Sequence, residues 1–193
     1  MKRSLILTLL LSFGAITAWA QFGAIIPASD LTSWAWDCNI YDPEPGLVTI
    51  YVLHVLSPQP MSGSQFKIDH YDDVVLTWLA DTVTPPYQSI GNSQTGIAVS
   101  YGSCQTSTIH IMTITYIGNG LSEACSLIWI APSPASVLPN VVAFDCSDPP
   151  RLVAVNAGGL VVNPDATCYC GLDPDPVEQT SWGSIKALYL DSE

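Results

Sequence analysis

The sequence is poor in basic residues and lacks the motifs that mark an enzyme. Only five of its 193 residues are Lys or Arg, against 17 Asp or Glu. It has no Gly-rich phosphate loop, no G-x-S-x-G turn and no H-E-x-x-H motif. Its three histidines are scattered and its acids gather in turns, so no nucleophile with a base and no carboxylate pair stands out. We therefore predict that the chain is not an enzyme.

Long apolar runs are also rare, and the one present lies at the start of the chain. Lys2 and Arg3 precede an apolar stretch, and the segment ends in the small-x-small triplet Ala18–Ala20. This pattern predicts a secretory signal peptide over residues 1–20. The run is short for a membrane span of about 20 residues. We therefore expect a secreted or cell-surface protein, with no stable insertion in a membrane.

Removing twenty of the 193 residues leaves a mature chain of 173 residues, Gln21 to Glu193, which is enough for one domain with a core. Three basic residues then face 17 acidic ones, a formal charge of −14. Such a charge makes nucleic acid and anionic membranes poor partners, and cations or basic protein surfaces better ones. The simplest interpretation is an acidic surface that keeps a secreted protein soluble.

Strand-like patterns dominate the mature chain, and the longest lies in Gly46–Asp69. From Gln65 to Asp69 apolar and polar residues alternate with a period of two, as in a strand with one buried face. Leu47–Leu56 is apolar almost throughout, which predicts a central strand covered on both faces. Shorter runs follow at Val74–Leu79, Ile97–Tyr101, Thr108–Ile117, Ser126–Ile130, Val141–Asp145, Leu152–Val155 and Leu160–Val162.

Gly, Pro and Asn separate these runs, and no helical periodicity lies between them, so we predict an all-β antiparallel sandwich of about nine strands. The predicted core contains Val48, Ile50, Val52, Phe66, Ile68, Leu76, Trp78, Val99, Ile111, Ile128 and Ile130. The segment Asp81–Gly96 reads as a long surface connection. His54 and His110 lie within apolar strands and are expected in the core or on a sheet face.

The six cysteines all lie in the mature chain, at Cys38, Cys104, Cys125, Cys146, Cys168 and Cys170. An even number in an exported chain predicts three disulfides. A bond within Cys-x-Cys is strained, so Cys168 and Cys170 should reach different partners. If Ser126–Ile130 and Val141–Asp145 form a hairpin, Cys125 and Cys146 lie opposite each other at its open end. We therefore favour that pair, with Cys38 and Cys104 joined to Cys168 and Cys170 in either order.

The composition divides the chain further. We expect a signal peptide at 1–20, an N-terminal extension at 21–44, the sandwich at 45–164, a Cys-x-Cys segment and stiff acidic Pro linker at 165–179, and a short C-terminal amphipathic helix at 180–193. Thr180 and Ser181 can cap this helix, and its apolar stripe is Trp182, Ile185, Leu188 and Tyr189. The stripe docks either on its own domain or on another surface component, because so short a helix is not stable alone.

Two further clusters are candidate sites. Trp34 and Trp36 share one face of an extended segment, where they form either a stacking platform for sugar rings or a lid on the core. Asp69, Asp72 and Asp73 lie in the sequence DHYDD, which is either a Ca²⁺ site or a solvated acidic turn. No other cofactor is expected.

The order of the strands resembles that of the cohesin-like branch of the carbohydrate-binding β-sandwich superfamily, over roughly Pro45–Pro164. The matching segments are Val48–Val52, Ser64–Asp69, Asp73–Trp78, Gly96–Tyr101, Thr113–Tyr116 and Gly158–Val162. This resemblance implies a nine-stranded jelly-roll sandwich that binds proteins or glycans and performs no chemistry. Cohesins that bind dockerins are typically poor in cysteine, unlike this chain. The tail Trp182–Tyr189, W-G-x-I-K-x-L-Y, also resembles the ends of short secreted proteins of environmental bacteria.

Together these features predict a secreted recognition or scaffolding module that binds an extracellular protein or polysaccharide. The alternative is a structural subunit of a surface assembly or filament. In that case the N-terminal segment or the C-terminal helix of one copy docks on the next copy, so the chain self-associates.

Overall fold

The computed structural model describes residues 23–32, 37–55, 59–168 and 170. In these ranges the chain forms thirteen strands, more than the nine expected, and no helix. The strands are β1 (Ala24–Ala28), β2 (Asn39–Ile40), β3 (Pro45–Val55), β4 (Met61–His70), β5 (Leu76–Val83), β6 (Gln88–Asn92), β7 (Gly96–Gln105), β8 (Ile109–Asn119), β9 (Ser126–Ala131), β10 (Val142–Asp145), β11 (Leu152–Ala154), β12 (Asn156–Ala157) and β13 (Gly159–Val162). Within the described ranges no helix is long and apolar enough to cross a membrane. The helix expected at 180–193 lies outside them.

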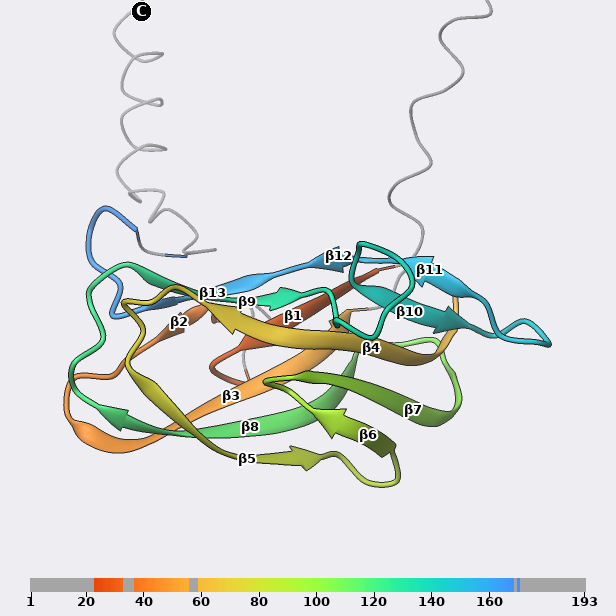
Figure 1. Ribbon diagram of the computed structural model, residues 1–193, viewed down its shortest axis with the longest axis horizontal. Helices are drawn as coiled ribbons and strands as arrows, with labels where there is room; N and C mark the ends of the chain where they lie inside the picture. Colours follow the sequence, from red (N-terminus) through yellow and green to blue (C-terminus); the bar gives the residue numbers. More distant parts are fainter. Residues whose placement is uncertain (1–22, 33–36, 56–58, 169, 171–193) are drawn as a thin grey trace, which may run out of the picture.

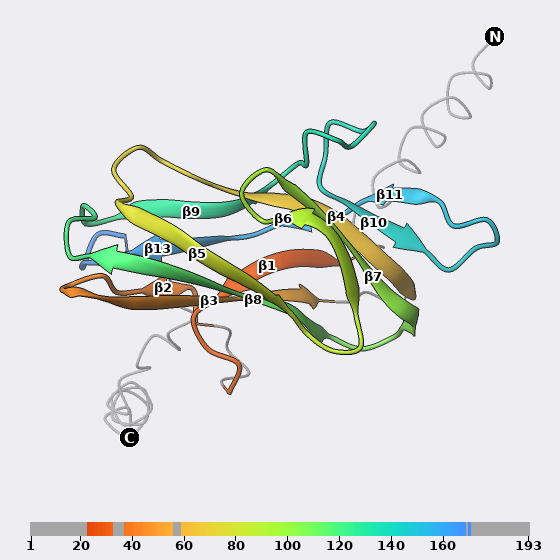
Figure 2. The same ribbon diagram turned by 60° about the horizontal axis from the view of Figure 1, so that its bottom comes forward.

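The strands form two sheets that pack as a sandwich (Figure 1). One sheet has five strands in the order β12-β1-β3-β8-β5. The other has eight: the path β11-β10-β4-β9-β13-β2, with β7 paired to β4 and β6 paired to β7. Figure 2 shows β3 and β8 in one layer and β4 and β9 in the other. We call the outward surfaces of the two sheets the five-stranded face and the eight-stranded face.

The chain passes from one sheet to the other between β3 and β4. In β3, Val48 and Ile50 point into the core, whereas Leu47 on the five-stranded face is 69% exposed. The prediction that this strand is covered on both faces is therefore wrong for its first half. The apolar run misleads here because β3 places residues of alternate parity on an uncovered surface.

The core lies between the sheets and contains most of the residues predicted for it. Nine of the eleven are buried: Val48, Ile50, Val52, Phe66, Ile68, Val99, Ile111, Ile128 and Ile130. Burying such a side chain contributes roughly 1.5–3 kcal/mol of transfer free energy. Leu76 is only half-buried and Trp78 is 38% exposed, because both belong to β5, which pairs with β8 alone at the edge of its sheet.

The segment expected as an N-terminal extension supplies two strands of the sandwich. β1 pairs antiparallel with β3, and its Ile25 is fully buried. β2 pairs with β13 and buries Ile40. These strands are too short to show a period in the sequence, and Pro27 interrupts the first of them, so neither was apparent before the sheet partners were known.

β9 and β10 do not form the expected hairpin. β9 pairs with residues 67–70 of β4, and β10 pairs with residues 61–65 of the same strand. The two strands therefore follow each other along β4, both antiparallel to it, and the loop between them is an insertion in one line of pairing. In Figure 2 this loop projects from the sheet near β4.

Three disulfides form, as the even number of cysteines predicts, but two of the expected pairings are wrong: Cys125 with Cys146, and Cys104 with Cys168 or Cys170. The bonds are Cys38–Cys170, Cys104–Cys146 and Cys125–Cys168. Cys168 and Cys170 do reach different partners. The expected Cys125–Cys146 pair depended on the hairpin, and because β9 and β10 lie end to end, these two residues are at opposite ends of the combined line.

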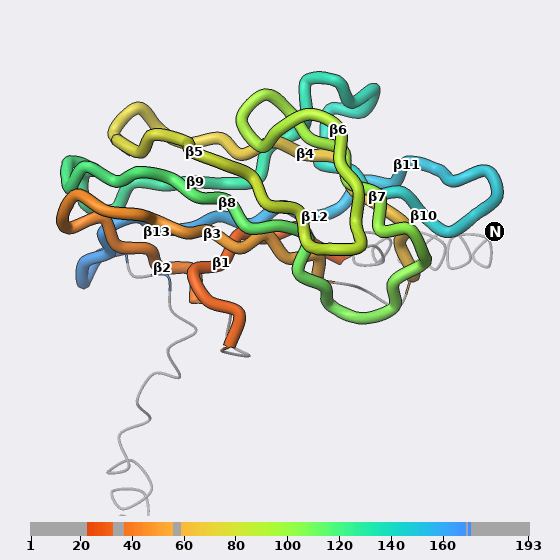
Figure 3. Tube along the Cα trace, turned by 90° about the horizontal axis from the view of Figure 1, so that it is seen from below, coloured from red at the N-terminus to blue at the C-terminus, as the bar shows by residue number. Residues whose placement is uncertain are grey.

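The expected surface connection over Asp81–Gly96 contains the end of β5 and all of β6 (Figure 3). A polar clasp holds this edge together. The Asp81 carboxylate accepts hydrogen bonds from the Ser93 backbone N–H at 2.6 Å, from the Ser93 hydroxyl at 2.7 Å and from the Trp78 indole at 3.0 Å. Gln94 donates to the Tyr116 hydroxyl at 3.0 Å, and burial raises the pKa of Tyr116 to about 12. The clasp therefore links the two sheets at their open edge.

A buried carboxylate closes one end of the sandwich. Asp42, almost fully buried, accepts hydrogen bonds from the Ser122 hydroxyl at 2.8 Å and from the Gly120 backbone N–H at 3.1 Å. Its own backbone N–H donates to the Asn163 side chain at 2.7 Å. Because a buried carboxylate is costly without such partners, this network fixes the loops next to β2, β8 and β13.

Candidate protein-binding groove

A groove of about 400 Å³ lies on the eight-stranded face, over the adjacent strands β6, β7, β4 and β10. Its lining residues are Ser62, Gly63, Gln88, Ser89, Ile90, Ala98, Val99, Ser100, Phe144 and Pro150. Its volume falls within the range of about 300–1,000 Å³ that is usual for binding sites. No charged side chain is among them.

The floor of the groove is low because the two middle strands carry small residues on this face. Gly63 of β4 lies opposite Ser100 of β7, and Ala98 of β7 lies opposite Ile90 of β6. Gly63 is also required for close packing. A Cβ atom there would lie 2.6 Å from the Val99 carbonyl oxygen and 3.2 Å from Cδ2 of Phe144. Any larger residue would therefore have to move the backbone.

The walls are apolar and come from the flanking segments. Ile90 stands on β6 with 83% of its surface exposed. Phe144 stands on β10, in register with Gly63, and Pro150 lies in the loop after β10. Exposed apolar surface of this kind, set around a concave floor, is typical of a site that buries part of a partner.

The groove continues into a polar cavity of about 380 Å³. The two share Ser62, Ser100 and Pro150, and the polar part adds Gly102, Ser103, Cys104, Asp145, Cys146 and Ser147. A ligand that fills both parts would therefore meet apolar side chains at one end and hydroxyl groups at the other.

Asp145 is held in place by its own loop. Its Oδ1 accepts hydrogen bonds from the Ser147 hydroxyl at 2.6 Å, from the Arg151 backbone N–H at 2.7 Å and from the Ser147 backbone N–H at 3.1 Å. The Ser147 hydroxyl, and then the Arg151 backbone N–H, lower the pKa of this carboxyl below its usual 3.8. A carboxylate that is ionised and already bonded in this way orders the loop and is a poor general acid.

The disulfide Cys104–Cys146 braces the groove. Cys104 lies near the end of β7 and Cys146 follows β10, and both strands pair with the first half of β4. The bond therefore connects the floor strand β7 to the wall strand β10, across β4. It restricts how far the wall on β10 can move away from the floor.

The two Lys or Arg residues in the described ranges both lie close to the groove. Lys67 follows the floor residues along β4 on the same face and forms an ion pair of 2.7 Å with Asp69. Arg151 is exposed and follows the wall residue Pro150. Lys67 is therefore already paired, and Arg151 lies in the loop that holds the ionised Asp145.

Comparison with known proteins matches the fold and not the sequence. No family model matches the chain, and no curated protein matches it. A type II cohesin domain from the cellulosome of Acetivibrio cellulolyticus shares the fold with a TM-score of 0.50 and 12% identity, covering 74% of this chain and 95% of that one. The chain has a cohesin-like fold.

Other cohesins are similar at lower scores. A Clostridium thermocellum cohesin crystallised in a cohesin–dockerin complex has a TM-score of 0.48 and 12% identity, covering 74% of this chain and 99% of that one. A non-cellulosomal cohesin from the archaeon Archaeoglobus fulgidus has a TM-score of 0.47 and 10% identity, covering 73% and 91%.

The cohesin-like sandwich does not bring the predicted calcium ligands together. Asp69 pairs with Lys67, and Asp72 is exposed in the turn after β4. Asp73 accepts a backbone hydrogen bond from Glu123 through its carbonyl. These three acids do not form a group of ligand atoms within 4.8 Å of one another. The predicted binding residues Trp34, Trp36, Trp182, Ile185, Leu188 and Tyr189 lie outside the described ranges.

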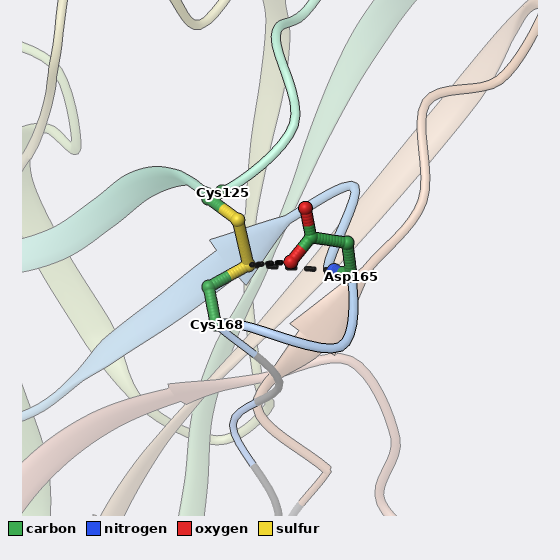
Figure 4. A group of neighbouring side chains, drawn as sticks. All are labelled: Cys125, Asp165 and Cys168. Atoms are coloured by element: carbon green, nitrogen blue, oxygen red, sulfur yellow. Dashed lines mark hydrogen bonds between the residues drawn. A yellow bond between two sulfur atoms is a disulfide. The ribbon is translucent and has the colours of Figure 1, made fainter.

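Within those ranges, one group of three potential metal ligands does come within 4.8 Å: Cys125, Asp165 and Cys168. Figure 4 shows that the two sulfur atoms are bonded to each other, with Asp165 beside them. The Asp165 carboxylate accepts hydrogen bonds from the Thr167 hydroxyl at 2.6 Å and its backbone N–H at 2.7 Å. Since disulfide sulfur is not a thiolate ligand, this cluster is a bonded turn.

The histidines occupy the structural positions expected for two of them. His54 is buried, and its Nδ1 lies 2.8 Å from the Tyr101 hydroxyl, which joins the two sheets through the core. His110 is half-buried on the five-stranded face, where Thr84 and Thr113 contact its two ring nitrogens. Burial lowers the pKa of His110. Neither ring lines the groove.

The groove residues were not predicted, although part of their pattern is visible in the sequence. In β7, the small residues Ala98 and Ser100 alternate with the buried Ile97, Val99 and Tyr101. A strand whose outward side chains are all small predicts a low surface. Gly63 carried no such signal, because the Pro, Ser and Gly around it resemble a connection and not the start of β4.

Proposed function

We propose that this chain is a non-enzymatic, extracellular protein-recognition module and that its groove binds an apolar segment of a protein partner. The observation that carries the proposal is the concave, uncharged surface between Ile90 and Phe144, built on the small residues Gly63 and Ala98. Fold likeness does not define a ligand. The proposal therefore rests on the groove, and the cohesin-like architecture is compatible with it.

The shape favours a protein over a polysaccharide. Sugar sites commonly combine several aromatic faces with charged groups to hold a pyranose ring. Phe144 is the one aromatic residue of the lining, and the polar groups around it are serine hydroxyls and a glutamine. A helix about 10 Å wide suits a trough that reaches from β6 to β10, three strand spacings or ~14 Å.

Affinity capture with paired variants tests this proposal. The bait is the mature chain, exposed to the extracellular and surface fractions of the producing cells. Ala98→Glu places a charge on the floor. Ile90→Asp replaces an exposed apolar side chain of the wall and leaves the core unchanged. We expect each variant to lower the affinity for a specific protein partner by about 30-fold or more, as for an interface hot spot.

Thr115→Glu, on the five-stranded face, is the matched control and should retain the partner. If both groove variants keep every partner that the unmodified chain binds, the groove is not the recognition surface. A polysaccharide array run with the same four proteins identifies a glycan ligand, which would replace the protein proposal.

A further inference from the structure

The groove leaves apolar side chains in water. Ile90 is 83% exposed, and Phe144 and Pro150 face it across a floor without charge. Leaving such a surface open in a secreted chain costs free energy and invites non-specific association. A segment of the same chain could cover it without any partner.

The C-terminal sequence has the complementary chemistry. Residues 180–193 carry the apolar stripe Trp182, Ile185, Leu188 and Tyr189, with spacings that place the four on one side of a helix. A helix that presents apolar residues at such spacings to a groove is a common mode of recognition. Trp182 is an anchor of the kind that dominates binding energy.

Charge contributes less to this match than the apolar residues do. The stripe is preceded by Asp173, Asp175 and Glu178, which are acidic, in a linker otherwise rich in Pro. Lys67 and Arg151 border the groove, and they are the two Lys or Arg residues of the described ranges. Lys67 is already paired with Asp69, and Arg151 lies beside the ionised Asp145, so Arg151 alone offers the acidic linker an opposite charge at this border.

The tail starts from a fixed point. Cys170 is bonded to Cys38, and its backbone N–H and carbonyl are both hydrogen-bonded to the Asn39 side chain, at 3.0 and 2.8 Å. This point lies beside β2, three strands from β4 along the path β4-β9-β13-β2.

The linker is long enough to reach the groove. Three strand spacings amount to ~14 Å. Asn39 is level with Val161, Leu127 and Tyr71, and the groove residue Gly63 lies eight residues, or ~27 Å, from that level along β4. The two distances combine to ~30 Å. The ten steps from Cys170 to Thr180 span ~31 Å in an extended Pro-rich conformation of about 3.1 Å per step. The tail can therefore reach the groove of its own chain.

We propose that residues 180–193 dock in the groove of the same chain, through the stripe Trp182, Ile185, Leu188 and Tyr189, and act as an internal ligand that a partner must displace. This proposal rests on the proposed function of the groove. A short tether gives the tail an effective concentration of about 1 mM, so docking within one chain precedes docking between copies at ordinary protein concentrations.

A peptide titration tests the proposal. The probe is a fluorescent synthetic peptide of residues 176–193, and the proteins are the mature chain and a form that ends at Asp175. The shorter form keeps all thirteen strands and all three disulfides, because these lie within residues 23–170. We expect the shorter form to bind the peptide and the intact chain to bind it at least about tenfold more weakly, because its own tail competes.

Matched variants identify the contact. In the shorter form, Ala98→Glu and Ile90→Asp should abolish binding, and Thr115→Glu should leave it unchanged. A peptide with Trp182→Ala and Leu188→Ala should not bind. Circular dichroism of each protein confirms that a loss of binding is not a loss of fold.

Three outcomes would overturn the proposal. In the first, neither form binds the peptide; in the second, both forms bind it equally. In the third, light scattering shows that the intact chain forms oligomers that grow with concentration, which assigns the groove to the tail of a second copy. The proposed function is tested separately, because the shorter form can still capture an external protein through a groove that its own tail never occupied.

Discussion

The two outer faces of the sandwich are made of similar strands and differ in shape. On the five-stranded face, threonines lie opposite one another across the strands: Thr49 pairs with Thr115, and Thr113 pairs with Thr82. Side chains of similar size therefore lie next to one another on neighbouring strands of this face. Their hydroxyl groups and methyl groups suit a surface in contact with water.

On the eight-stranded face, side-chain size changes from strand to strand. Gly63 and Ala98 lie on the middle strands, whereas Ile90 and Phe144 lie on the flanking ones. The hollow therefore comes from the size of residues in register and needs no long loop. Comparison of the two faces teaches that a binding surface on a sheet can be built by the distribution of small residues alone.

The faces also differ in covalent bracing. All six cysteines lie in or next to strands of the eight-stranded sheet or in the segment after it, and none lies in a strand of the five-stranded sheet. A surface that must keep its shape for a partner benefits from such bonds, because a preorganised site loses less entropy on binding.

The largest expected effect follows from removing one brace. Cys104→Ser with Cys146→Ser should lower the free energy of unfolding by about 2–4 kcal/mol, measured by urea denaturation. Hydrogen exchange should speed up in β7 and β10 and remain unchanged in β3 and β8. Equal loss of protection in both sheets would show that the bond stabilises the whole domain and not the groove face.

A smaller effect on stability distinguishes the groove floor from the five-stranded face. Gly63→Val should cost about 1–3 kcal/mol, because the new side chain would overlap the Val99 carbonyl and Phe144. Thr49→Val, an isosteric change on the five-stranded face, should stay within about 0.5 kcal/mol, as surface substitutions usually do. Urea denaturation of both variants measures the difference. A Gly63→Val protein as stable as the control would mean that the floor has room.

Much of the fold follows from local patterns in the sequence. The alternation from Gln65 to Asp69 and the apolar residues of β8 place Phe66, Ile68 and Ile111 in the core, where they lie. Patterns of this kind indicate which side chains are buried, and this can be predicted for each strand from its own sequence, without knowing its neighbours. The number of cysteines likewise predicts three bonds.

The remainder depends on which strands are neighbours. The expected Cys125–Cys146 pair failed because two runs that look like a hairpin both pair with β4. The groove escaped prediction for the same reason, since Gly63, Ala98 and Phe144 come together only through register. Trp78 was placed in the core because the sequence does not show that β5 is an edge.

A change of pH should affect the five-stranded face first. Burial lowers the pKa of His110, beside Tyr51 and Thr113, below the usual 6.5. Between the two pKa values the unfolded chain binds more protons than the folded one, so stability falls as the pH drops through 6.5. Thermal denaturation between pH 7.5 and 5.5 should show a small loss that His110→Gln removes. An unchanged loss in that variant would assign the effect to another group.

The smallest expected effect is a loss of stability in acid that arises from Asp145, beside the groove. The folded-state pKa of Asp145 lies below its ordinary 3.8, with the Ser147 hydroxyl as the main cause. Its stabilising contribution is therefore present above 3.8 and is lost as the pH falls below that value. Asp145→Asn should remove this acid dependence and slightly lower stability at pH 7, because the stabilising contribution of the carboxylate is present at that pH. Acid titration followed by near-ultraviolet circular dichroism measures it.

Site-specific photo-crosslinking tests most directly whether recognition belongs to the eight-stranded face. A benzophenone amino acid is placed at Ile90 or at Leu47, which are both well exposed and lie on opposite faces. The form ending at Asp175 is then irradiated with the extracellular fraction of the producing cells. We predict a discrete protein adduct from position 90 and none from position 47. An adduct from position 47 alone, or the same adduct from both positions, would contradict the account.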